Sequence, residues 1–200
     1  RLRLAGLLVS FKSFCPLEIF SQVGDVDNLD RFYVSGNLAL IIDGAEPIGA
    51  SASTVHQFLD DALVTITALA VDGLRPLRDC VAEFAGCWTP PLGTRDVDFA
   101  ASLAIARLSD SGLEVYRLGD CSAILASSNS MTVIADDASV DRERSFVTLD
   151  AQGKQSFLES LVARRTEVIR GGGALLVPRA LPSSMGETRR ISADPGDILI

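Results

Sequence analysis

The sequence has little of several residue types that common functional sites require. Its 200 residues include one histidine, His56, and four cysteines, Cys15, Cys80, Cys87 and Cys121. The cysteines form no CxxC pair, so the spacing of a zinc site is absent, and we expect them to be reduced. We expect His56 at a helix surface or cap. No Ser-His-Asp triad and no cysteine or histidine nucleophile motif is evident.

Long hydrophobic runs and an excess of basic charge are also missing. No window approaches the ~20 apolar residues of a membrane span. The arginines before the first apolar run resemble a signal peptide, but Lys12 ends that run and no convincing cleavage site follows. The first run therefore predicts a strand, and we predict a cytoplasmic protein without a membrane partner.

Acidic residues outnumber basic ones by 26 to 18, which gives a net charge of −8. This balance argues against a nucleic-acid partner, because the phosphate backbone attracts basic surfaces. It is compatible with sites that collect cations and equally with an ordinary soluble surface. The apolar content is 48%, with 22% charged residues, which is typical of a globular chain.

Hydrophobic periodicity predicts strands and helices in one chain of ordinary domain size. Two apolar segments around Ser35-Gly36 predict a hairpin. Short apolar segments between Phe99 and Asp137, separated by turns, predict an antiparallel meander, and a last strand follows a Pro-Gly-Asp turn. Three segments have helical spacing, and three glycines end the last of them: Ala50–Val71, Leu74–Phe84 and Ala151–Ile169.

Three aspartates stand at the edges of predicted strands. Asp43, followed by Gly44, ends the apolar segment Leu38–Ile42, which suits a strand that is covered on both faces. Asp30 precedes the partner strand, and Asp120 lies between two apolar strands. Asp-Gly is also a common turn pair, and alone it favours a turn. Carboxylates fixed by strands nevertheless make a stiff set of oxygen ligands, which suits Mg²⁺ or Mn²⁺.

Three segments in order carry a family resemblance: NLDRFYVSGNLALIIDGA, LEVYRLGDCSAIL and ISADPGDILI. The first resembles an N-E-D loop, hairpin and D-G strand. The second resembles a G-D-S-R strand pair, and the third resembles the strand that leads to a further D-G motif. Together they resemble the PPM-type, metal-dependent Ser/Thr protein phosphatases, also called type 2C. The likeness spans nearly the whole chain, from about Ser21 to Ile200.

The resemblance implies an α+β fold of two packed antiparallel β-sheets flanked by helices, an αββα sandwich. Residues 1–200 would form part of one such domain. It further implies a binuclear Mg²⁺ or Mn²⁺ centre, with a third, weaker ion, that hydrolyses phosphoserine and phosphothreonine in proteins through activated water. Asp43 would bridge the ions, and Gly44 would offer its backbone carbonyl. Asp30 would act through metal-bound water, and Asp120 would help to hold the third ion.

Several positions depart from the family pattern. The glutamate of the N-E-D loop is Leu29 here, which cannot hold a metal-bound water. The arginine that grips substrate phosphate falls at Asp25, with Arg31 as a possible substitute, and the arginine after G-D-S is Ala123. The family's two remaining metal aspartates would lie downstream of Ile200, so the resemblance implies a C-terminally incomplete domain.

These features leave three hypotheses. The first is a phosphoprotein phosphatase that is active only in a longer form. The second is a catalytically idle relative that binds phosphoproteins or other partners as a scaffold. The third is a generic sandwich domain with fortuitous turns. The retained aspartates favour the enzyme, whereas Leu29 and Asp25 favour the scaffold.

Overall fold

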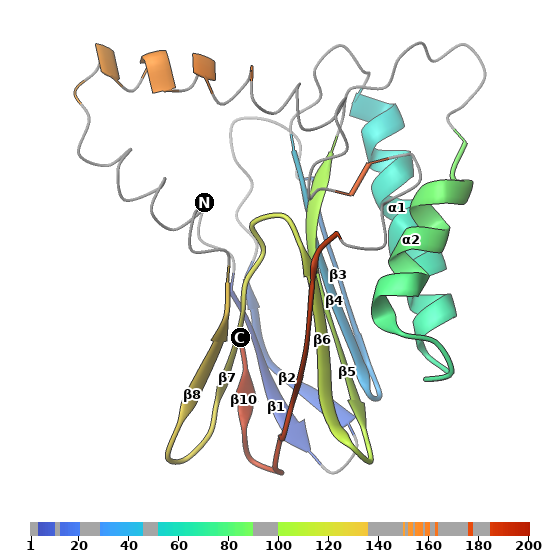
Figure 1. The fold of residues 1–200 in the computed structure, drawn as a ribbon, viewed down its shortest axis with the longest axis vertical. Helices are drawn as coiled ribbons and strands as arrows, with labels where there is room; N and C mark the ends of the chain where they lie inside the picture. The colour runs from blue at the N-terminus through green and yellow to red at the C-terminus, as the bar shows by residue number, and fades with distance from the viewer. Residues whose placement is uncertain are drawn as a thin grey trace.

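The structure is a computed structural model in which ten strands of the described residues form two antiparallel sheets (Figure 1). The residues that it describes are 4–10, 13–20, 29–45, 52–89, 100–135, 150, 152–153, 155–157, 159–160, 163, 176–177 and 185–200. Each sheet has five strands. Figure 1 shows the two sheets packed face to face as two layers.

The first sheet, here called the β1 sheet, has the strand order β2-β1-β10-β7-β8. Its strands are β1 (Leu4–Ser10), β2 (Ser13–Phe20), β7 (Ala123–Ala126), β8 (Met131–Ile134) and β10 (Ile198–Leu199). The second, the β4 sheet, has the order β3-β4-β5-β6-β9. Its strands are β3 (Asp30–Ser35), β4 (Leu38–Gly44), β5 (Ala101–Ser109), β6 (Gly112–Leu118) and β9 (Glu187–Ile191).

Two helices, α1 (Ala52–Ala70) and α2 (Leu77–Cys87), cover the outer face of the β4 sheet (Figure 1). The apolar residues of α1 recur at helical spacing and are fully buried at Val55, Phe58 and Leu59. They share one core with alternate residues of β4, among them Leu40 and Ile42. Burial of this apolar face supplies most of the helix stability, because short helices are marginal in water.

A second core fills the space between the two sheets. Ala39 of β4 and Val115 of β6 contribute to it from one sheet, and Val9 of β1 and Leu125 of β7 from the other. Strand β4 therefore has a core on each of its faces. This double burial explains why its sequence is an uninterrupted apolar run and not an alternating one.

The two-sheet α+β architecture that the family resemblance implied is confirmed. The first helix agrees with the predicted range within two residues at its start and one at its end. The second helix begins at Leu77 and not at Leu74, because Pro76 stands at its N-cap and proline disfavours helical geometry at the preceding Arg75.

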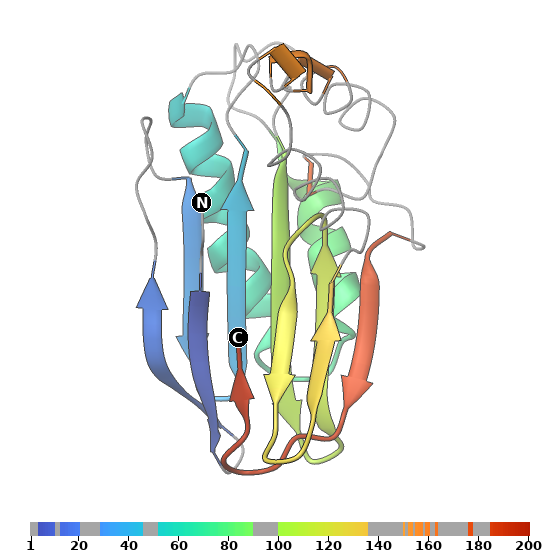
Figure 2. The ribbon, with the colours of Figure 1, turned by 90° about the vertical axis from the view of Figure 1, so that its left-hand side faces the viewer.

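The predicted helix Ala151–Ile169 lies only partly in the described residues, and those between 152 and 163 are helical. Figures 1 and 2 show them at one end of the sandwich and not on the outer face of the β1 sheet. The three glycines expected to end this helix lie outside the described residues, as does Asp25. None of the helices in the described ranges is long and apolar enough to cross a membrane.

Tyr116 of β6 is held in the helix-side core and provides a pH-dependent test of the packing. Its side chain is 1% exposed, and its hydroxyl donates a hydrogen bond to the Met185 carbonyl at 3.2 Å. Burial disfavours the phenolate and raises the pKa of Tyr116 from 10.0 to about 12.

We predict that Tyr116 lowers the stability of the fold at alkaline pH. The pKa of Tyr116 is higher in the folded state than in the unfolded state. The stabilisation by the buried neutral phenol is therefore complete below pH 10 and is lost as the pH rises toward about 12. Absorbance titration at 295 nm should show one of the two tyrosines ionising about two pH units late. Tyr116→Phe should remove that late step. A late step that persists in this variant would contradict the assignment.

Candidate carboxylate site

Two of the predicted aspartates face each other across neighbouring strands. Asp30 on β3 is paired in register with Asp43 on β4, and Asp43 is paired in turn with Ser102 on β5. Residues directly opposite in an antiparallel sheet project to the same face, with Cβ atoms about 5 Å apart. The three side chains therefore form a row across one end of the β4 sheet.

The row lies on the face of the β4 sheet that is turned toward the β1 sheet. Leu40 and Ile42 of β4 pack against the helices, whereas Ala39 belongs to the core between the sheets. Side chains alternate along a strand, so Asp43 projects to the same side as Ala39. The carboxylate stands where β4 ends, and its residue is partly exposed.

Asp120 joins the row through Ser102. It follows β6 in a turn at which Gly119 has a positive φ of 83°, a conformation that glycine adopts at little cost. The Ser102 hydroxyl donates to the Asp120 carboxylate, and the Asp120 backbone N–H donates to the Ser102 hydroxyl at 3.3 Å. The structure thus places Asp30, Asp43 and Asp120 at one end of one sheet, although they are far apart in the sequence.

Sequence reasoning did not identify Ser102. Its side chain is buried, with 6% of the residue exposed, and it links Asp43 to Asp120. The available signal was a hydroxyl near the start of the apolar segment FAASLAIARL, one strand away from the Asp-Gly pair. Ser102 can be assigned to the site only once β5 is known to pair with β4, and no local sequence pattern predicts that pairing.

Arg31 projects to the opposite face of β3 from Asp30. Its guanidinium donates to the Asp60 carboxylate of α1, to His56 Nδ1 at 2.9 Å and to the Asp30 backbone carbonyl at 3.0 Å. Because a guanidinium has only donors, His56 Nδ1 is the acceptor of that bond. The geometry ties Arg31 and His56 to the junction of sheet and helix. It gives no support to Arg31 as a phosphate ligand, a role that stays a prediction.

Gly44 is required by packing in this structure. A Cβ at this position would lie 2.7 Å from the Leu29 carbonyl oxygen and 2.7 Å from Leu59 Cδ1. The Gly44 N–H also donates to the Leu29 carbonyl at 3.2 Å. Leu29 itself is buried in the helix-side core, with 4% exposed. The glycine is thus explained without a metal, and its role as a carbonyl ligand stays a prediction.

The described residues do not form a complete binuclear metal centre. Within the described ranges, no three or more His, Cys, Asp or Glu residues are grouped as metal ligands. Divalent Mg²⁺ and Ca²⁺ require about six or more oxygen ligands, of which the protein carboxylates usually supply several. The facing pair Asp30 and Asp43 is therefore at most part of a cation site.

Comparisons with known proteins find similarity in solved structures. No protein-family model matches the sequence, and no curated protein matches it. The PPM Ser-Thr phosphatase MsPP from Mycobacterium smegmatis is 16% identical; the match covers 98% of this chain and 76% of that one, with a TM-score of 0.48. The serine/threonine phosphatase PstP from Mycobacterium tuberculosis is 16% identical over 99% and 77% of the two chains, with a TM-score of 0.47.

A further structure, the catalytic domain of PstP in complex with two manganese ions, is 16% identical over 97% and 76% of the chains, with a TM-score of 0.46. Each of these proteins is a serine/threonine phosphatase. The identities are below 25% and the TM-scores below 0.5, so the activity of this chain does not follow from them.

We predict that Gly44→Ala destabilises the metal-free protein by about 3 kcal/mol, because the added methyl meets a backbone oxygen that cannot rotate away. Urea unfolding measures the loss. Gly36→Ala is the matched control: Gly36 has a φ of +56° with nothing within 4 Å of an added Cβ. It should cost only about 1 kcal/mol from backbone strain. Equal losses in the two variants would contradict the packing explanation.

Proposed function

We propose that this chain is part of a PPM-type, metal-dependent phosphatase that hydrolyses phosphoserine and phosphothreonine in proteins. The observation that carries the proposal is the pairing of Asp30 with Asp43 at the end of a doubly buried strand. The described residues would contribute this facing carboxylate pair to the metal site, and the cation would be Mg²⁺ or Mn²⁺. Further ligands would come from outside the described residues.

The physical support is electrostatic. Like charges directly opposite each other in a sheet destabilise it, by roughly 0.2–1 kcal/mol for an exposed pair. A divalent cation between the two carboxylates would reverse the sign of that interaction. Strand β4 is held between two cores, so the carboxylate of Asp43 is carried on a rigid element, as a metal ligand should be. Ser102 and Asp120 extend the polar row beside it.

A second candidate function is a catalytically idle, phosphatase-like domain that binds phosphoproteins or other partners. Two observations favour it. Leu29 is buried in the helix-side core where the family pattern has a glutamate, and Arg31 is engaged with Asp60 and His56. No hydrolytic step can be derived from the described residues alone, since they do not form a complete metal site.

We predict that manganese raises the melting temperature of the protein. A cation that binds only the folded state adds RT ln(1 + [L]/Kd), about 1.4 kcal/mol at a tenfold excess over Kd. For a chain of this size that corresponds to roughly 4 °C. With only two facing carboxylates we expect weak binding, so millimolar manganese is needed. Differential scanning fluorimetry at a series of manganese concentrations measures the effect.

Asp43→Asn should remove most of this shift, because it nearly preserves the shape of the side chain and removes its charge. Asp79→Asn is the control: Asp79 lies on α2, on the other side of the β4 sheet, and its side chain is 50% exposed. This variant should retain the full shift. Equal shifts in the wild type and both variants would show that manganese binds elsewhere, and the role of Asp43 would be wrong.

Phosphate release separates the two candidate functions. With manganese and a phosphothreonine peptide, the phosphatase proposal predicts release of inorganic phosphate by the longest expressible form of the protein. Asp43→Asn should abolish that release, and Asp79→Asn should leave it unchanged. A manganese-dependent melting shift without any phosphate release would decide for the idle binding domain.

A further inference from the structure

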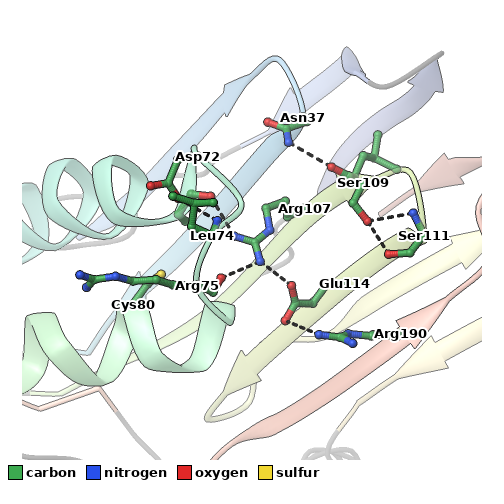
Figure 3. A network of polar contacts seen from close by, with 12 residues as sticks. Asn37, Asp72, Leu74, Arg75, Cys80, Arg107, Ser109, Ser111, Glu114 and Arg190 are labelled. Atoms are coloured by element: carbon green, nitrogen blue, oxygen red, sulfur yellow. Dashed lines mark hydrogen bonds and ion pairs between the residues drawn. The ribbon is translucent and has the colours of Figure 1, made fainter.

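A polar pocket lies at the end of the β4 sheet opposite the carboxylate row. It has a volume of about 520 Å³ and is formed by the β3–β4 turn, the β5–β6 turn, the residues after α1 and part of β9. Ser109 at its rim and Ser102 of the carboxylate row stand at opposite ends of β5, about 23 Å apart along the strand. Figure 3 shows the residues that matter here: Asn37, Asp72, Arg107, Ser109, Glu114 and Arg190.

A buried ion pair stands in the wall of this pocket. Arg107 on β5 is paired in register with Glu114 on β6, which is paired in turn with Arg190 on β9. Arg107 and Glu114 are 5% and 7% exposed, and Arg107 Nη2 donates to Glu114 Oε2 at 2.7 Å. Arg107 also donates to the carbonyls of Ala70 and Arg75, at 3.0 and 2.7 Å. Both terminal nitrogens of Arg107 are thus engaged within the protein, so it is not available to hold an anion.

One buried acceptor in the wall of the pocket has unused hydrogen-bonding capacity. Among the described residues nothing donates a hydrogen bond to Glu114 Oε1, although this atom is buried. The guanidinium of Arg190 stands 4.0 Å away, beyond hydrogen-bond length, on a side chain that is 74% exposed. A buried acceptor without a donor costs about 1–3 kcal/mol, and more when it is charged. A ligand that presents a donor here recovers that free energy.

Two arginines already lie beside Glu114, but the rest of the pocket lining adds negative charge, which favours a cation as that donor. Asp72 lines the pocket just after α1, and its Oδ1 accepts a hydrogen bond from the Leu74 N–H at 3.0 Å. Helix α1 has no basic residue in its last turn, so its C-terminal partial negative charge adds to that of Asp72. The Ser109 hydroxyl is already bonded to the Gly112 carbonyl at 3.1 Å, which leaves the carboxylates as the principal ligand groups.

We propose that this pocket binds a small organic cation through an ammonium or guanidinium group that donates to Glu114 Oε1, with Asp72 as a further negative charge in the lining of the same pocket. The volume is that of an ordinary small-molecule site. Arg190 competes with the ligand for the same oxygen and is exposed enough to swing away. The proposal rests on this pocket alone and is independent of the phosphatase proposal.

Isothermal titration of the full chain at low ionic strength with putrescine, a four-carbon diamine, tests the proposal. Succinate, a four-carbon dianion of similar length, is the matched probe of opposite charge. We expect saturable 1:1 binding of putrescine and none of succinate. Binding of succinate, or no saturable binding of putrescine, would overturn the proposal.

Three variants locate the ligand. Asp72→Asn should weaken putrescine binding roughly tenfold, the loss expected for a charge-assisted contact, while its amide oxygen can still accept from Leu74. Arg190→Gln should tighten binding severalfold, because it removes the competing cation. Asp79→Asn should leave the affinity unchanged.

Glu114→Gln should abolish binding, but it also leaves Arg107 buried without its counter-charge, so its fold must be verified by circular dichroism. Should this variant unfold, Asp72→Asn and Arg190→Gln still decide the matter. Unchanged affinity in both, or weaker binding in Arg190→Gln, would show that putrescine does not lie beside Glu114.

Discussion

The burial of β4 on both faces is the constraint on which the rest of this structure depends. One face of the strand packs on α1 and α2, and the other packs in the core between the sheets. A strand held from both sides can shift neither in register nor in angle without exposing apolar surface, at about 25 cal/mol per Å². Leu38, Leu40 and Ile42 fix the helix-side face, and Ala39 fixes the other. The position of Asp43 follows from that packing.

Both polar features of the β4 sheet lie at the ends of its doubly buried strands, on opposite faces. The row of Asp30, Asp43 and Ser102 faces the other sheet, whereas Arg107 and Glu114 lie on the helix side near the far turns. The choice of face follows from side-chain alternation along each strand. Near the ends of the strands the cores are replaced by turns and backbone carbonyls, to which Arg107 bonds. The middle of the sheet consists of packed apolar side chains, and the polar side chains of both features lie near its ends.

Breaking the buried pair of Arg107 and Glu114 would cost more than its formation contributes. A buried ion pair offsets a large desolvation penalty, and removal of one partner leaves an uncompensated charge that costs about 3–5 kcal/mol. Here Arg107 also bonds the carbonyls at the end of α1 and in the following turn. The pair therefore fixes the helix connection against the β4 sheet, and it orients the Glu114 carboxylate in the wall of the polar pocket.

The two-sheet α+β class was implied by the family resemblance of three sequence segments. The sequence by itself determined the extent of α1, the hairpin from β3 to β4 and the presence of carboxylates at strand ends. These follow from local periodicity and turn chemistry, which act over a few residues. Only the tertiary structure decided that Ser102 links Asp43 to Asp120, that Arg31 points to α1, and that Glu114 faces Arg190. These facts depend on which strands become neighbours. Strand β9 joins β6, and β10 lies between β1 and β7, across long stretches of sequence that no local pattern encodes.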